Sequence, residues 1–363
     1  MSTGDGIARL RALLAAEARA LLAVNASDRL WQMPFAAALA TGLPLLAGAW
    51  FGNLEHGLVA SLGGMVFLYC PHTPMSHRMV LLLAGAFGMT ASYALGMLSH
   101  LVPALMMPML TFIAIVVTMI CRFYQLGPPG SLFFIMAAAI GAYTPTALAE
   151  IPRMVGLCAL GSLLACVVAF FYSLLSLRLR PADPVRPLPE PGFDFVVFDS
   201  VVIGVFVGGS LALAQALGME KAYWAPISCL AVMQAQTLRA LWTKQLQRVL
   251  GTALGLALAW ALLLLPLDAW RISLVMMLLT FIIEMMVVRH YGLAVLFITP
   301  MTILLAEAAT LGHGAGAGLV AARFADTVLG CLVGLAGGVC LHGPRFRAVA
   351  GGALRRGLGK LSP

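Results

Sequence analysis

Apolar residues gather in about twelve runs along the chain, and short polar segments separate them. A helix needs about 20 apolar residues to cross a bilayer, and most of the runs approach that length. The shorter runs at 56–71 and 222–236 are interpreted either as crossings or as half-helices. The pattern predicts an all-α polytopic membrane protein with spans near 33–52, 56–71, 79–99, 101–121, 130–148, 154–177, 195–217, 222–236, 249–266, 272–288, 291–308 and 319–341.

Several sequence features of the first half of the chain recur in the second half. The segment Leu-Thr-Phe-Ile occurs at 110–113 and again at 279–282. Arginines recur with it, in the pairs Arg78 with Arg248 and Arg153 with Arg323. An even number of spans in each half gives both halves the same orientation, so the sequence predicts two parallel six-helix repeats.

The same pattern divides the chain into five parts. The residues between and beyond the two repeats are polar or rich in proline, and residues 7–24 have the apolar period of a surface-lying helix. We predict a cytoplasmic amphipathic N-terminal segment at 1–32, a first membrane repeat at 33–177, a Pro-rich cytoplasmic linker at 178–194, a second membrane repeat at 195–342 and a basic cytoplasmic tail at 343–363.

Composition supports a membrane protein. Hydrophobic residues make up 61% of the chain and charged residues 10%, whereas soluble domains carry about 25% charged residues. The net charge of +8 does not indicate nucleic-acid binding, because the basic residues sort by membrane side. With the N-terminus inside, the outer side keeps only Arg153, Lys221, Arg271 and Arg323. We therefore expect a multi-pass protein of a bacterial inner membrane with both termini in the cytoplasm and no cleavable signal peptide.

The most distinctive stretch runs from Tyr223 to Gly255 and reads YWAPISCLAVMQAQTLRALWTKQLQRVLGTALG. It resembles the fusaric acid resistance protein-like family, which includes bacterial aromatic carboxylic acid exporters. Arg323, Asp326, Thr327 and Gly330 at the start of the last span are similar to the same family. The resemblance implies export of aromatic acids. Larger members carry a soluble cytoplasmic domain where this chain has only its short linker.

Arg323 and Asp326 are the first candidate site residues, since charges inside a membrane usually face a cavity or a partner. Their i, i+3 spacing places both side chains on one helix face. One interpretation is a mutually satisfied ion pair. The other is an anion-binding or gating arginine that Asp326 holds in place, because a guanidinium binds a carboxylate with two parallel hydrogen bonds.

Two further groups are candidates for substrate binding or gating. Lys221, Tyr223 and Trp224 open the eighth run, where they form either an interfacial aromatic belt or an outer vestibule for an aromatic acid. Gln234, Arg248 and Arg78 lie toward the cytoplasmic side, where they form an inner anion-attracting mouth or simply fix the topology.

Glu284 stands inside the tenth run and is the candidate for proton coupling. The alternative is a structural pair with Arg289. His72 and His77 give only a weak metal signal, and Pro145 and Pro300 predict interrupted helices of the kind that often line substrate sites. No nucleotide-binding or catalytic motif occurs in the structural setting that it would need to function. We therefore expect no enzyme activity, no cofactor and no bound metal.

The function that these observations favour is proton-coupled export of small organic anions, with aromatic carboxylic acids as substrates. A passive anion channel and a non-transporting membrane assembly or scaffold protein are the alternatives. Membrane lipid and the organic anion are the expected partners. A periplasmic adaptor protein and a homo-oligomer are left open, and nucleic acid is not expected.

Overall fold

The structure is a computed structural model that describes residues 19, 21–185, 187–188, 192–308 and 316–359. Every regular element in these residues is a helix, which confirms the predicted all-α class. The first half contains α2 (Gln32–Trp50), α3 (Leu54–Gly64), η1 (Met65–Tyr69), α4 (Met75–His100), η2 (Pro103–Leu105), α5 (Met106–Phe123), α6 (Leu132–Ala142), η3 (Leu148–Glu150) and α7 (Ile151–Leu179). The second half contains η4 (Asp194–Phe198), α8 (Asp199–Ala216), α9 (Trp224–Met233), α10 (Leu238–Leu263), α11 (Ala269–Met286), α12 (Tyr291–Ala308), α13 (Gly316–His342) and α14 (Pro344–Gly359).

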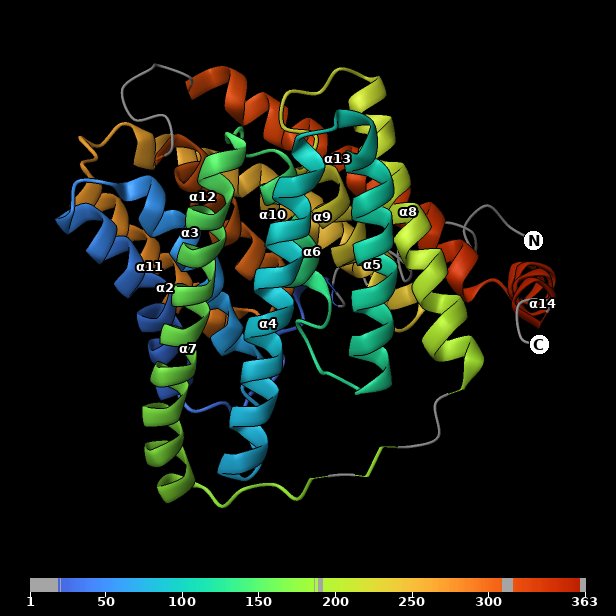
Figure 1. Cartoon of the computed structure of the whole chain (residues 1–363), viewed down its shortest axis with the longest axis horizontal. Helices are drawn as coiled ribbons and strands as arrows, with labels where there is room; N and C mark the ends of the chain where they lie inside the picture. Colours follow the sequence, from blue (N-terminus) through green and yellow to red (C-terminus); the bar gives the residue numbers. More distant parts are fainter. Residues whose placement is uncertain (1–18, 20, 186, 189–191, 309–315, 360–363) are drawn as a thin grey trace, which may run out of the picture.

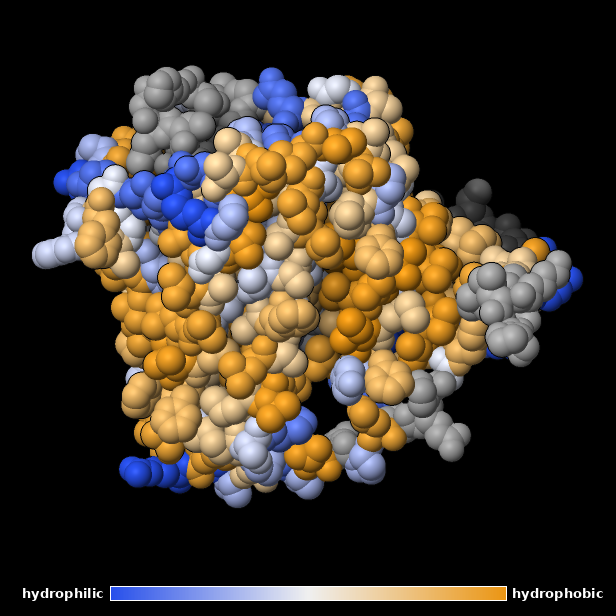
Figure 2. Space-filling model, viewed as in Figure 1, coloured by the Kyte–Doolittle hydropathy of each residue, from blue (hydrophilic) through white to orange (hydrophobic). Residues whose placement is uncertain are grey.

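Within the described residues, 8 helices are long and apolar enough to cross a membrane, and the shorter apolar helices are α3 with η1, α6, α9 and α12. The short helices are the second and fifth of each half. At 10 residues, α9 is about 15 Å long, about half of the hydrocarbon core. Figure 2 shows a broad hydrophobic face with hydrophilic residues at its upper and lower margins. The chain is a multi-pass membrane protein, and its exact number of crossings stays a prediction.

Two predicted helix boundaries and one predicted interruption differ from the structure. The expected basic connector before 249 is the first part of α10, which begins at Leu238 after Thr237 caps the N–H of Ala240. The helix α6 ends at Ala142, before Pro145, as an interrupted helix should. The predicted interruption at Pro300 is wrong, because α12 continues through it.

The two halves pack in the same order. In each half the third apolar helix packs against the fifth (α4 on α6, α10 on α12) and the second against the sixth (α3 on α7, α9 on α13). Between the halves, the fourth helix of each packs against the first helix of the other, which gives the pairs α5 with α8 and α11 with α2. This order agrees with the predicted duplication, which stays a prediction.

The recurring Leu-Thr-Phe-Ile segment does not mark equivalent positions in this packing. Leu110 lies about one turn into α5, whereas Leu279 lies almost three turns into α11. At the interfaces between the halves, Gly208 of α8 meets Thr111, while Gly42 of α2 meets Met277. Thr111 and Met277 therefore occupy matching places at these interfaces, whereas Thr111 and Thr280 do not.

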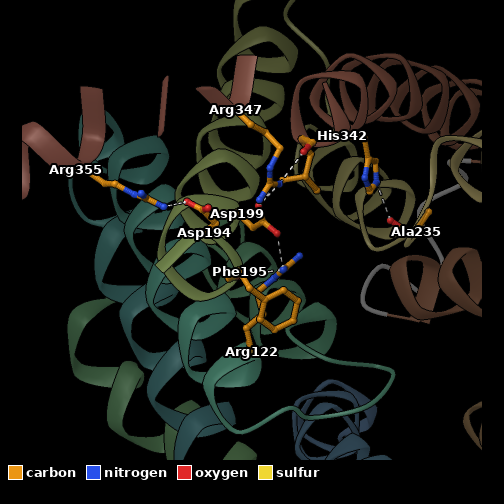
Figure 3. A network of polar contacts seen from close by, with 9 residues as sticks. Arg122, Asp194, Phe195, Asp199, Ala235, His342, Arg347 and Arg355 are labelled. Carbon is orange, nitrogen blue, oxygen red and sulfur yellow. Dashed lines mark hydrogen bonds and ion pairs between the residues drawn. The ribbon is translucent and has the colours of Figure 1, made fainter. Parts of the chain in front are cut away.

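Ion pairs tie the halves together at the predicted cytoplasmic end (Figure 3). Arg122 at the end of α5 donates to Asp199 at the start of α8 over 2.9 Å. Arg347 of α14 donates to the other oxygen of Asp199 over 2.7 Å, and Arg355 pairs with Asp194 over 2.6 Å. One carboxylate thus joins the first half, the second half and α14.

The segments outside the membrane helices follow the predicted layout in part. The linker passes along the lower margin of the molecule from α7 to α8 (Figure 1). The predicted basic tail is helical over Pro344–Gly359 as α14. The predicted surface helix at 7–24 lies almost entirely outside the described residues.

Candidate functional site

Arg323 and Asp326 lie inside the second half, on α13. Their exposed fractions are 4% and 0%. Among the described residues, Nε and Nη1 of Arg323 and both carboxylate oxygens of Asp326 have no hydrogen-bond partner. The mutually satisfied pair that the spacing allowed is therefore not formed. Unsatisfied buried polar atoms are rare in folded proteins and often mark a functional site.

Aromatic rings line the space beside Arg323. Its guanidinium carbon lies 3.9 Å from the centroid of the Trp224 ring, which is cation–π geometry. Tyr223 contacts Trp224 with ring centroids 4.9 Å apart, and Tyr143 contacts Tyr223 at 5.5 Å. Tyr143 follows α6 of the first half, so both halves contribute to this row of rings.

Arg248 brings a second buried guanidinium to the same region. It is 6% exposed on α10, donates through Nη1 to the Tyr291 hydroxyl over 2.8 Å and through Nη2 to the Ser228 hydroxyl over 3.1 Å. Its Nε has no partner in the described residues. The charges of Arg248 and Arg323 are close enough to repel each other, so an anion between them would be stabilised.

Glycine packing explains how these charged groups become so deeply buried. A Cβ at Gly330 would collide with the carbonyl oxygen of Ala225, and one at Gly334 would lie 2.7 Å from that of Cys229. These glycines allow α13 to pack closely against α9, and this packing brings Arg323 into contact with Trp224 at the start of α9. The positive end of the α9 backbone dipole lies at this start. The close approach of α13 to α9 at these glycines therefore builds the site.

Arg78, Gln234 and Lys221 are the other predicted site residues, and no direct contact between their side chains and Arg323 or Asp326 is recorded among the described residues. Arg78 is fully buried, and it donates to Ser173, Ser176 and the Thr73 carbonyl and contacts His72. Nη1 thus joins α4 to α7, while Nε and Nη2 hold the loop that precedes α4. Gln234 donates to the Pro129 carbonyl over 3.0 Å, and Lys221 lies partly exposed in the turn before α9. The inner mouth predicted from Arg78 and Arg248 together is not a shared cluster.

Glu284 is paired, and its partner is Arg29 rather than Arg289. The distance from Arg29 Nη1 to Glu284 Oε2 is 3.0 Å, and the same nitrogen donates to the Glu284 carbonyl oxygen over 3.3 Å. Arg29 precedes α2, so this pair joins the first half to α11 of the second. Its place matches that of Arg122 with Asp199, except that the fourth helix carries the carboxylate here and the arginine there.

The sequence analysis missed Ser228 and Tyr291 as partners of Arg248, and Arg29 as the partner of Glu284. A single hydroxyl in an apolar run gives no signal of its own, and helix packing alone decides which arginine it meets. No cluster of three metal-ligating side chains exists in the described part of the chain. His77 contacts the Thr73 hydroxyl over 2.8 Å, and His72 lies between Arg78 and the Pro181 carbonyl.

Comparison with known proteins supports the resemblance noted in the sequence. Residues 202–337 match the family described as fusaric acid resistance protein-like, and this range contains Trp224, Arg248, Arg323 and Asp326. The chain is also 32% identical over 146 residues to a protein of Bacillus subtilis (strain 168) named "Uncharacterized membrane protein YvaC". That match covers 40% of this chain and 23% of the relative, so the chain spans less than a quarter of it. No solved structure gives a significant match.

Proposed function

We propose that this chain is a transporter that binds small organic anions, with aromatic carboxylates preferred, and carries them outward across the membrane. The observation that carries the proposal is the buried Arg323 guanidinium, whose Nε and Nη1 have no partner in the described residues. An organic carboxylate supplies acceptors for these N–H groups, and hydrogen bonds between two charged groups are stronger than neutral ones. The fusaric acid resistance-like match supports the same substrate class.

The rings beside Arg323 support an aromatic substrate. A planar acid that pairs with the guanidinium can place its ring against Tyr223 or Tyr143. Arg248 adds positive charge on the other side of the cluster. Because Tyr143 belongs to the first half and the arginines to the second, movement of one half against the other would change the site, as alternating access requires.

Proton coupling is the finer part of the proposal, and Glu284 is the carrier that the sequence suggests. Its ion pair with Arg29 lies at an interface between the halves. Protonation of Glu284 would break this pair and loosen the contact of α11 with the first half. An anion leaving a cell also gains about 2.3 kcal/mol per 100 mV from the inside-negative potential. The proton gradient and the membrane potential therefore have to be tested separately as energy sources.

The main test measures efflux of benzoate from loaded proteoliposomes. We expect Arg323→Gln to lower the initial rate by about tenfold or more, since a hydrogen-bonded charge contributes about 1.5–3 kcal/mol. Arg153→Gln is the matched control, because Arg153 pairs only with Glu150 at an exposed site. Unchanged efflux in Arg323→Gln would contradict the binding role, and equal losses in both variants would show a general effect on folding.

The coupling test uses the same vesicles with a proton gradient and a membrane potential imposed one at a time. Proton coupling predicts that the pH gradient alone drives benzoate movement and that Glu284→Gln abolishes this drive. Transport that is unaffected both by collapse of the proton gradient and by Glu284→Gln would contradict the coupling proposal. Organic-anion transport itself would then stand.

A further inference from the structure

We infer that Asp326 is a proton-binding group that switches Arg323 between an anion-receptive and an occupied arrangement. The inference rests on the proposed anion-binding function and adds its control by protons. Neither the family match nor the sequence pattern assigns this role to Asp326, for which the sequence suggested only a holding role.

The burial of Asp326 is the first observation. Its side chain is 0% exposed, and neither carboxylate oxygen has a donor among the described residues. An ionised carboxylate without donors is costly to bury, and uptake of a proton removes that cost. In the arrangement that the structure shows, a proton on Asp326 would therefore lower the free-energy cost of burying this carboxylate.

The position of Arg323 is the second observation. Its guanidinium lies over the Trp224 ring at 3.9 Å instead of hydrogen bonding with Asp326 one turn away. Side chains at i and i+3 on a helix are within reach of each other. Once Asp326 loses its proton, rotation about side-chain bonds brings a carboxylate oxygen to an unpaired guanidinium N–H of Arg323. The carboxylate of the protein and that of the substrate then compete for these N–H groups.

The surrounding groups leave Asp326 as the titrating member of the cluster. Tyr143 and Tyr223 are within electrostatic range of Asp326. Phenols are neutral between pH 5 and pH 8, because their ordinary pKa is about 10. Arg323 on the same helix supplies the positive charge next to Asp326. Arg248 from α10 and Cys331 of α13 lie within electrostatic range of Arg323.

The linkage has a definite sign. Anion binding to Arg323 favours the protonated form of Asp326, so protons and anions strengthen each other's binding. Affinity for an anion therefore rises as the pH falls through the titration of Asp326, and one proton is taken up with each anion bound. A site of this kind carries proton and anion in the same direction. Export of the anion driven by protons that enter the cell would then need a second proton-binding site. This is the role proposed for Glu284.

The experiment measures equilibrium binding of benzenesulfonate to the purified full chain between pH 5 and pH 8. This probe stays ionised throughout, so its own titration does not contribute. We expect wild-type affinity to rise with falling pH, by up to about tenfold per pH unit where one proton is linked. Asp326→Asn imitates the protonated form and should bind at every pH with the affinity that the wild type reaches only at low pH.

Asp268→Asn is the matched control and should keep the wild-type pH dependence, because Asp268 is an exposed N-cap of α11. If Asp326→Asn fails to fold, Asp326→Glu replaces it and should retain a pH dependence with a shifted midpoint. Persistence of the full pH dependence in Asp326→Asn overturns the inference, as does loss of its binding at all pH values. Absence of any binding by the wild type contradicts the proposed function instead, so the two failures are distinguishable.

Discussion

Arg323 combines two features that are rarely found together in one side chain. It is 4% exposed inside an apolar bundle, yet two of its nitrogens have no partner in the described residues. Its contact with the Trp224 ring offsets part of the cost of burial, since a desolvated cation–π contact contributes about 2 kcal/mol. The contact leaves Nε and Nη1 without an acceptor among the described residues, so an anion can bind their N–H groups.

Replacing Trp224 should therefore change both the arginine and the substrate site. We expect Trp224→Leu to weaken benzoate binding by about tenfold, because Arg323 loses its support, and Trp224→Phe to keep part of the affinity as a weaker ring. Trp242→Leu is the control, since Trp242 is exposed on α10. Equilibrium binding in detergent checks this, and a Trp224→Leu variant with unchanged affinity would contradict the role of the ring.

The sequence identified most of the site residues but not their grouping. Arg323 and Asp326 were recognisable as charges within an apolar run, and Trp224 as part of a distinctive motif. Arg248 was assigned to an inner mouth with Arg78, because distance along the chain gave no sign that α9 would bring it toward Arg323. Side-chain partners such as Ser228 depend on helix packing, which hydrophobic periodicity alone does not specify.

At the scale of helices, glycines set how closely the elements approach. On α8, a Cβ at Gly208 would overlap the Thr111 side chain of α5, whereas Gly209 has open space beside it. The two residues are neighbours in one helix but face different surroundings. They therefore separate the effect of close packing from the intrinsic helix preference of alanine over glycine.

Gly208→Ala should destabilise the protein by about 1–3 kcal/mol, because the added methyl group forces α8 away from α5. Gly209→Ala should instead be neutral or stabilise by up to about 1 kcal/mol, since alanine is the better helix former. Thermal unfolding of both variants in the same detergent measures the difference. Equal melting temperatures would show that the α5–α8 interface yields without cost.

At the scale of the whole molecule, two ion pairs join the halves. The arginine comes from the first half and the carboxylate from the second half in both pairs. Arg122 of the first half pairs with Asp199 of the second, and Arg29 of the first half pairs with Glu284 of the second. Each lies where the fourth apolar helix of one half meets the start of the first helix of the other. The matching places of the two pairs agree with the predicted duplication. Alignment of the two Leu-Thr-Phe-Ile segments does not show this match, because the segments lie at different depths in α5 and α11.

A double-mutant cycle tests whether the Arg29–Glu284 pair holds the halves together. Arg29→Gln and Glu284→Gln should each lower the stability, and the double variant should lose less than the sum, with a coupling of about 0.5–3 kcal/mol. Arg180→Gln is a control, because its pair with Asp28 is exposed and contributes little. Additive losses for Arg29 and Glu284 would show that the contact does not stabilise the interface.

The most direct measurement of the central claim is an experimental structure with bound 4-iodobenzoate, in which the iodine marks the ligand. We expect the carboxylate to accept hydrogen bonds from the Arg323 guanidinium, with the ring against the aromatic row of Trp224 and Tyr223. An occupied site at Arg78, or a ligand found only in the lipid-facing surface while the Arg323 guanidinium stays empty, would contradict it.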